Sequence, residues 1–144
     1  MKKIGLGIGA LLIIIIVGFF SEMSEKSNLP EDIRVHIESK ADLITLAEPV
    51  PGTEVGSPLT VHGEAKGYWF FEASFPIILT DADGIIIAEG YVTAQSDWMT
   101  EDFVPFEGTL EFAPQGDRGI LILKRANASG LPEHDDALEI PVTF

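Results

Sequence analysis

The feature of this sequence that most restricts its fold is a series of short apolar runs that begins near Leu43. Several runs alternate apolar and polar residues as half-buried strands do, and none keeps the 3.6-residue period of an amphipathic helix. The separators are rich in Gly, Pro, Asp and Ser, which supply turn dihedrals. The runs cover residues 43–47, 58–65, 69–79, 85–94, 103–112, 119–126 and 137–143. Seven strands in about 100 residues predict an immunoglobulin-like antiparallel β-sandwich.

The third run lies in the aromatic stretch GYWFFEASFPIILTDADG, residues 67–84. If residues 69–79 form one strand, every second side chain faces the same side of the sheet. The uniformly apolar face would be Trp69, Phe71, Ala73, Phe75, Ile77 and Leu79, and the other face Phe70, Glu72, Ser74, Pro76, Ile78 and Thr80. We therefore predict that the first face fills the space between two sheets and binds no ligand.

Two further features of this stretch predict local geometry. Pro76 lacks an amide hydrogen, which predicts a bulge or an edge position. The dipeptide Asp83-Gly84 tolerates positive φ angles, which predicts the tip of a hairpin. The next two runs complete the predicted core with Ile86, Ala88, Val92 and Ala94 on one face of the fourth, and Val104, Phe106, Leu110 and Phe112 on one face of the fifth.

The N-terminal 23 residues are directed to a membrane. Two lysines precede an uncharged apolar segment, residues 4–20, which as a helix would reach about 26 Å, close to the ~30 Å hydrocarbon layer. We predict an uncleaved single-pass anchor with the C-terminal domain outside the cytoplasm; a cleaved signal peptide is the alternative, although VGFFSEMS offers no small-x-small site. Gly5 and Gly9 form a G-x-x-x-G pair, which is compatible with a weak homodimer.

Residues 24–42 are charged and interrupted by Pro30, as expected of a stalk between the anchor, residues 1–23, and the sandwich domain, residues 43–144. Within the stalk, IRVHIE alternates as a short strand would. The chain carries a net charge of −14, and because Lys2 and Lys3 precede the apolar segment, the part after residue 20 carries −14 − 2 = −16. Such an acidic chain excludes nucleic-acid binding through a basic surface, and with no cysteine it has neither a disulfide nor a thiolate.

Catalytic arrangements find little support in the sequence. The histidines are His36 in the stalk, His62 in the second run and His134 in an acidic loop, and none predicts a Ser-His-Asp triad. Paired carboxylates are the alternative, with Glu72 as the acid and a partner among Asp97, Glu101 and Asp102, as in an enzyme that cleaves envelope glycans. We expect no catalytic residue and no cofactor.

Calcium is the more credible ligand for the acidic loops. Asp81 with Asp83, and Asp135 with Asp136 next to Glu133 and His134, supply hard oxygen donors. Neither group has the spacing of a calcium-binding helix-loop-helix motif, and a solvated acidic turn is the favoured interpretation. These four aspartates are therefore weak metal candidates.

The loop QSDWMTEDF is the best candidate for recognition of a partner. Trp98 and Met99 are large apolar residues in a loop that joins two strands, and such loops often carry binding residues. A lid that closes one end of the core is the competing interpretation. Phe70 and Ile78, on the outer face of the third run, would extend the contact surface unless the stalk strand covers them, and Glu72 on the same face is a further binding candidate.

The region from Leu43 to Phe144 resembles one family. The shared elements are Ser57-Pro58-Leu59, the V-x-G strand end at residues 61–63, the aromatic strand at residues 69–75, Asp97-Trp98-Met99 and the terminal I-P-V-x-F at residues 140–144. They resemble the immunoglobulin-like domain associated with bacterial germination and sporulation proteins, the second type of the Gmad domains. The resemblance implies an exported or membrane-attached bacterial protein and supplies no catalytic residues.

Taken together, these features predict a membrane-anchored immunoglobulin-like module outside the cytoplasm. It would bind or scaffold an envelope protein or glycan, in a context related to germination or sporulation, and catalyse no reaction. The alternative is a glycan-active or calcium-dependent envelope protein that uses surface carboxylates.

Overall fold

The computed structural model describes residues 28–144, which contain one α-helix, seven strands and two short 3₁₀ helices. The elements are α2 Glu31–Lys40, β1 Ile44–Glu48, β2 Leu59–Lys66, η1 Gly67–Trp69, β3 Ser74–Asp81, β4 Ile86–Ala94, β5 Phe103–Leu110, β6 Arg118–Lys124, η2 Pro132–His134 and β7 Ala137–Thr143. Each of the seven predicted runs overlaps one strand. Residues Glu31–Phe144 form one compact unit.

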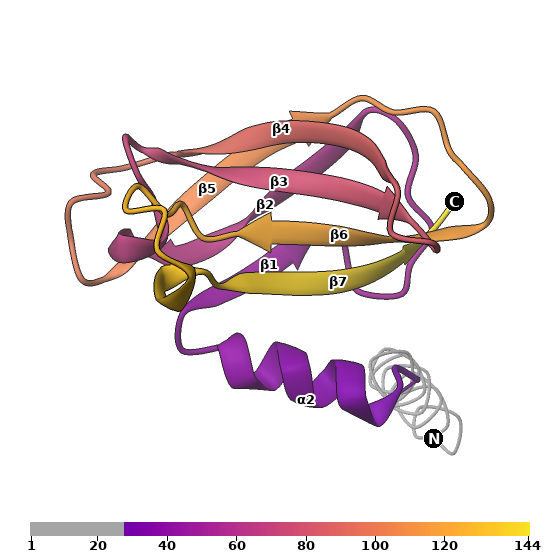
Figure 1. The fold of residues 1–144 in the computed structure, drawn as a ribbon, viewed down its shortest axis with the longest axis horizontal. Coiled ribbons are helices and arrows are strands. Elements are labelled where there is room, and N and C mark those ends of the chain that lie inside the picture. The colour runs from indigo at the N-terminus through magenta and orange to yellow at the C-terminus, as the bar shows by residue number, and fades with distance from the viewer. Residues whose placement is uncertain (1–27) are drawn as a thin grey trace, which may run out of the picture. The chain divides into compact units, whose positions relative to one another are not determined.

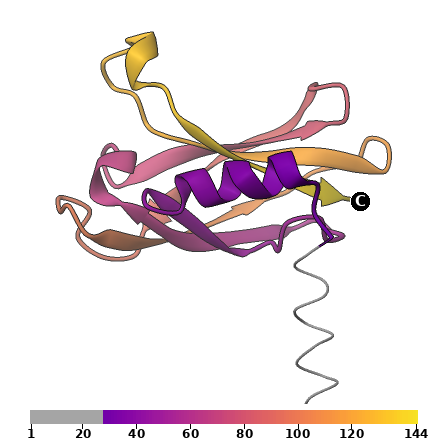
Figure 2. The same ribbon diagram turned by 90° about the horizontal axis from the view of Figure 1, so that it is seen from below.

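The strands pair throughout as antiparallel neighbours in the order β1-β2-β5-β4-β3-β6-β7 (Figure 1). The pairing of β4 with β5 is limited to Thr93 with Glu107 and Ala94 with Phe106. Because so short a ladder acts as a fold line, the sheet doubles over into two layers, β1-β2-β5 and β4-β3-β6-β7 (Figure 2). This all-β architecture is consistent with the predicted immunoglobulin-like sandwich.

The core between the layers is organised around Phe75. Its ring meets those of Trp69, Phe70 and Phe106 edge-on, at centroid distances of 6.5, 5.2 and 4.9 Å respectively. Edge-to-face contacts of this kind add about 0.5–1.5 kcal/mol to the free energy gained by burying each ring. The other fully buried large side chains are aliphatic: Ile44, Val61, Ile77, Leu79, Val92, Leu121, Leu123, Leu138 and Ile140.

The predicted third strand is wrong in its first half. Residues 67–69 form the 3₁₀ helix η1, and β3 begins only at Ser74. Between them Glu72 and Ala73 have positive φ angles of 50° and 63°, which end any extended conformation. The alternation of sides is lost there: Phe70 is buried, with 4% of its surface exposed, whereas Phe71 is 48% exposed.

A β-bulge explains a second wrong assignment, in β4. Leu79 pairs with Ala88, but Thr80 pairs with Ile86, so Ile87 is an extra residue that shifts the register. Ile86 therefore turns outward and is exposed, while Ile87 packs against the core in its place. The bulge is not at Pro76. This residue pairs with Tyr91 of β4 but has no partner in β6, so it occupies the predicted edge position only on the side of β3 that faces β6.

Helix α2 occupies the segment in which IRVHIE predicted a short strand, so that prediction is wrong. Ile33 and Ile37 also lie four residues apart, which places them on one face of a helix, and Ile37 packs against the core. Two acidic residues in the first turn and Lys40 in the last complement the helix dipole. Alternation over six residues therefore did not distinguish strand from helix.

Helix α2 lies along β7, one of the two edge strands (Figures 1 and 2). The His36 Nε2 atom accepts a hydrogen bond of 3.0 Å from the Glu139 backbone N–H. Farther along the edge, residues 52–55 pair with β7, where Gly52 N–H donates to Pro141 O at 2.7 Å. Covering an edge in this way removes a template for unwanted strand pairing.

The predicted membrane anchor lies outside the described residues. Among residues 28–144, no helix combines the length and the apolar character needed to cross a bilayer.

Candidate functional site

Three connections meet at one end of the sandwich, at the left of Figure 1. They are residues 67–73 between β2 and β3, residues 95–102 between β4 and β5, and residues 125–136 between β6 and β7. We call this surface, together with the first residue of β5, Phe103, the loop end.

Residues 67–73 hold the other two connections in place. On one side, the Gly67 N–H donates to Asp102 O at 3.2 Å, and on the other, the Ala126 N–H donates to Trp69 O at 2.9 Å. Gly67 is buried so close to the carbonyl oxygens of Trp98 and Thr100 that a Cβ atom would overlap both. The loop end therefore rests on a backbone that is hydrogen-bonded and tightly packed.

The loop end concentrates exposed apolar side chains. Of the ten large hydrophobic residues that are exposed in residues 28–144, half lie there. They come from all three connections and from β5: Tyr68, Phe71, Met99, Phe103 and Leu131. Tyr, Phe and Met are enriched at protein interfaces, so this composition favours a contact surface over a merely solvated end.

Two of these aromatic rings already form a cation–π contact with a basic side chain of the same chain. Lys66 Nζ lies 4.4 Å from the centroid of the Phe103 ring, and the Arg125 guanidinium lies 5.6 Å from that of Tyr68. Arg125 Nε also donates a hydrogen bond of 3.3 Å to the Tyr68 carbonyl oxygen. Both distances are within the range of cation–π attraction, about 6 Å.

The connections of the loop end also carry carboxylates, which are exposed except for the partly buried Asp136. Asp97 accepts a hydrogen bond from the Met99 N–H at 3.0 Å, and Asp135 accepts one from the Asn127 side-chain amide at 2.8 Å, so these two shape their loops. Within residues 28–144, no ion pair involves Glu72, Glu101 or Glu133.

The predicted recognition residues differ in how far the structure exposes them. Met99 is the most exposed large hydrophobic residue of residues 28–144, at 75%. Trp98 is partly buried and packs against the core, so it acts in part as the lid that was the competing interpretation. Phe70 is buried rather than on an outer face, because η1 turns it inward, and Glu72 is exposed in the turn.

The sequence did not single out Tyr68, Phe71, Leu131 and Arg125. Phe71 was assigned to the core-facing side of a strand, Tyr68 lies just before that predicted strand, and Leu131 and Arg125 lie near or in a connection whose path the sequence does not specify. The signal that was present is Gly67, since a glycine in front of an aromatic run favours a tight turn.

Three of the four weak metal candidates, Asp81, Asp135 and Asp136, have side chains that are bonded to other groups, and Asp83 takes part only through its backbone N–H. Asp81 Oδ1 accepts hydrogen bonds of 2.9 Å from the N–H groups of Asp83 and Ile85, which confirms the hairpin turn at Gly84, where φ is 81°. Asp136 forms an ion pair of 2.5 Å with Lys40, and Asp135 contacts Asn127. In the part of the chain that the structure describes, no three His, Asp or Glu side chains converge as a metal site requires.

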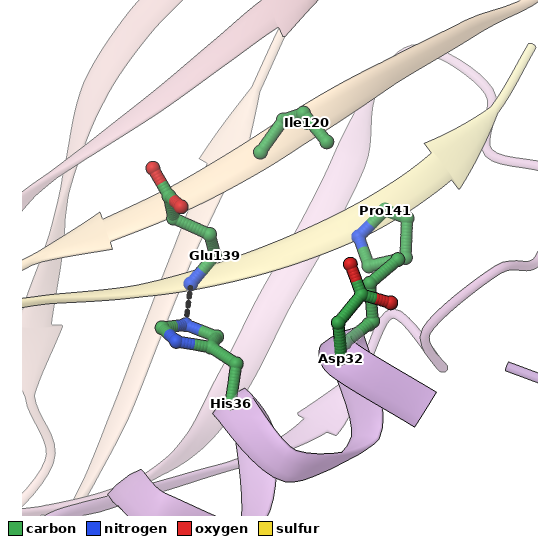
Figure 3. Close-up of a pocket in the computed structure, with 6 residues that line it drawn as sticks. Asp32, His36, Ile120, Glu139 and Pro141 are labelled. Carbon is green, nitrogen blue, oxygen red and sulfur yellow. Dashed lines mark hydrogen bonds between the residues drawn. The ribbon is translucent and has the colours of Figure 1, made fainter. Parts of the chain in front are cut away.

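The histidines also have structural partners. A hollow of about 270 Å³ lies between α2 and strands β6 and β7. Figure 3 shows the residues that line it, among which the His36 Nε2 atom accepts a hydrogen bond from the Glu139 N–H. His62 lies 3.4 Å from Glu48 on the surface. His134 Nδ1 lies 2.9 Å from Ser129 Oγ, but that hydroxyl also bonds Asn127 and the Leu131 N–H, all in an exposed loop.

The fold and the site together define a class: an immunoglobulin-like β-sandwich with an exposed, apolar loop end. Residues 43–130, which run from the start of the sandwich through β6, match the family described as the immunoglobulin-like domain of bacterial spore germination. The chain belongs to this family, which confirms the resemblance drawn from the sequence. Searches among curated proteins and among solved structures found no match.

Proposed function

We propose that the chain is a non-catalytic binding module of the bacterial cell envelope, held in the membrane by residues 4–20, whose loop end contacts a partner outside the cytoplasm. The observation that carries the proposal is that exposed Tyr68, Phe71 and Met99 lie together on connections fixed by backbone hydrogen bonds. A preorganised surface loses less conformational entropy on binding than a flexible one. The family's description supports a germination-related role.

The contacts of the polar residues support a non-catalytic role. A general base must reach its substrate proton within about 2.6–3.2 Å and be oriented by a further group. Of the three histidines, His36 serves the backbone of β7, His62 lies beside Glu48, and His134 belongs to a loop network. Apart from Asp136, which is partly buried in its ion pair with Lys40, the carboxylates of the loop end are exposed rather than held in a closed cleft.

Photocross-linking in the cells that make this protein tests the loop end. A photoreactive amino acid replaces Met99 or Phe71 in the full-length chain. In the controls it replaces Ile85, in the hairpin before β4, or Tyr91, on β4, whose exposed fractions lie between those of Phe71 and Met99. We expect a discrete adduct from positions 71 and 99 and none from 85 and 91. Equal adducts from all four positions, or adducts only from the controls, would refute the proposed surface.

Membrane attachment is tested separately. The full-length chain should resist extraction by alkaline carbonate, and a protease added outside intact cells should digest residues 31–144. Release by carbonate, or protection from the protease, would contradict the anchor or its orientation.

A further inference from the structure

We infer that the partner of the loop end is a basic polypeptide segment in which Arg or Lys side chains alternate with apolar ones. This inference rests on the proposed function, since it names the chemistry of what the same surface binds. Two properties of the surface lead to it: the charge around its apolar side chains and the use that its aromatic rings already make of cations.

The charge of the loop end is one-sided. The connections 67–73, 95–102 and 125–136 carry seven carboxylates and one guanidinium, hence −7 + 1 = −6. The carboxylates are Glu72, Asp97, Glu101, Asp102, Glu133, Asp135 and Asp136. Of these only Asp136 has an ion-pair partner among the described residues, Lys40. Adding the flanking Lys66 and Lys124 and the paired Lys40 still leaves −6 + 3 = −3.

Such a surface discriminates between classes of partner. Interfacial charges act mainly on the rate of encounter and on specificity, because complementary potentials attract and like charges repel. An anionic envelope polymer or an acidic protein would meet a net negative charge even with the neighbouring lysines counted, whereas an uncharged glycan would leave these carboxylates without compensation. A basic segment gains from each of them.

The aromatic rings of the loop end indicate how cationic side chains of a partner would bind. Both cation–π pairs within residues 28–144 lie at this end, where Lys66 covers Phe103 and Arg125 covers Tyr68. Phe71 is exposed on the same surface, and within the described residues no cation lies over its ring. A partner arginine or lysine would find at Phe71 the same type of contact, with the Glu72 carboxylate on the next residue.

The exposed apolar side chains of the loop end indicate that the partner segment also contains apolar residues. Met99 and Leu131 are aliphatic, flexible and exposed, and methionine adapts its shape to varied apolar side chains. Rim carboxylates alone contribute little affinity at physiological salt, where the Debye length is about 8 Å. A purely polar cation would therefore bind weakly, and the apolar residues of the partner supply most of the affinity.

Fluorescence anisotropy with labelled synthetic peptides of about twelve residues, mixed with the purified full-length chain, tests the inference. One peptide alternates Arg and Leu, a second has Glu in place of Arg, and a third has Ser in place of Leu. We expect the Arg-Leu peptide to bind about tenfold more tightly than either of the others, which corresponds to about 1.4 kcal/mol. Its affinity should fall severalfold as salt is raised from about 0.05 M to about 0.5 M.

Variants locate the binding. Phe71→Ser with Met99→Ser should weaken the Arg-Leu peptide about tenfold, and Glu101→Gln with Glu133→Gln should weaken it severalfold at low salt only. The matched controls, Ile85→Ser with Ile86→Ser and Glu54→Gln with Asp117→Asn, remove the same groups elsewhere and should change nothing. Control effects as large as those of the loop-end variants, or preferred binding of the Glu peptide, would overturn the inference.

Different experimental results would refute the binding function of the loop end and the basic nature of its partner. If positions 71 and 99 cross-link to a partner whose cross-linked part is acidic or a glycan, the binding function stands and the basic segment is refuted. If those positions yield no adduct in the cells, the binding function itself is refuted.

Discussion

Residues 67–73 and residues 74–81 are adjacent and both rich in large apolar side chains, yet they fold differently. The second segment is the interior strand β3, in which Phe75, Ile77 and Leu79 point inward at every second position. The first is a turn in which Trp69 and Phe70, direct neighbours, are both buried. Alternation therefore assigns side chains to the two faces of a sheet only while the chain stays extended.

The geometry of the 3₁₀ helix explains the difference. Successive residues of a strand point to opposite sides, whereas those of a 3₁₀ helix, with about three residues per turn, differ by about 120°. Two neighbouring aromatic residues can then both reach the core, while Tyr68 and Phe71 on either side of them face solvent. Two aromatic residues become surface residues because the chain turns.

The largest expected effect separates buried from exposed aromatic residues of this stretch. Trp69→Ala or Phe75→Ala should lower the free energy of unfolding by about 3–5 kcal/mol, because each leaves a cavity, whereas Phe71→Ala should change it by less than about 0.5 kcal/mol. Urea unfolding of the compact unit, residues 31–144, measures all three. A loss at Phe71 similar to that at Phe75 would mean that both lie in one strand after all.

A single methyl group tests how tightly the first segment is packed. Gly67→Ala places a Cβ against the carbonyl oxygens of Trp98 and Thr100, so the neighbouring connection must shift. We expect a loss of about 1–3 kcal/mol in the same unfolding experiment, the range typical of overpacking. Gly56→Ala is the matched control, since open space surrounds that position, and it should have little effect.

The end of β3 depends on a carboxylate rather than on packing. Asp81→Ala removes the acceptor for the N–H groups of Asp83 and Ile85 and should lower the free energy of unfolding by about 1 kcal/mol. Asp81→Asn retains an acceptor oxygen and should recover most of the loss. Equal losses in the two variants would show that the charge, not the hydrogen bonds, stabilises the turn.

The smallest expected effect is a gain in stability. Ala73 has φ of 63°, a conformation that disfavours L-residues by about 1–2 kcal/mol. Glycine removes this strain but loses about 0.4–1 kcal/mol more backbone entropy on folding. Ala73→Gly should therefore raise the free energy of unfolding by roughly 0.5 kcal/mol, while Ala88→Gly in β4 should lower it. A loss at position 73 would indicate that its conformation is not left-handed.

The recognition surface was only partly predictable from the sequence. Met99 was identified because it is a large apolar residue beside turn-forming and acidic residues in a loop between strands, and the same signal also selected Trp98, which packs against the core. Phe70 was misassigned because its exposure depends on the turn at residues 67–73, and Tyr68 and Arg125 contact each other across 57 positions of the chain. Local pattern contains no information on such a contact.

The sequence by itself determined the seven strands, the hairpin tip at Gly84 and the family, because alternation and turn chemistry act between near neighbours in the chain. Only the tertiary structure decided that IRVHIE is a helix along β7, that Ile86 turns outward and that Phe71 is exposed while Phe70 is buried. These outcomes depend on which surfaces meet when the two layers close over Phe75, and burial, which sets their free energy, is a property of the packed molecule.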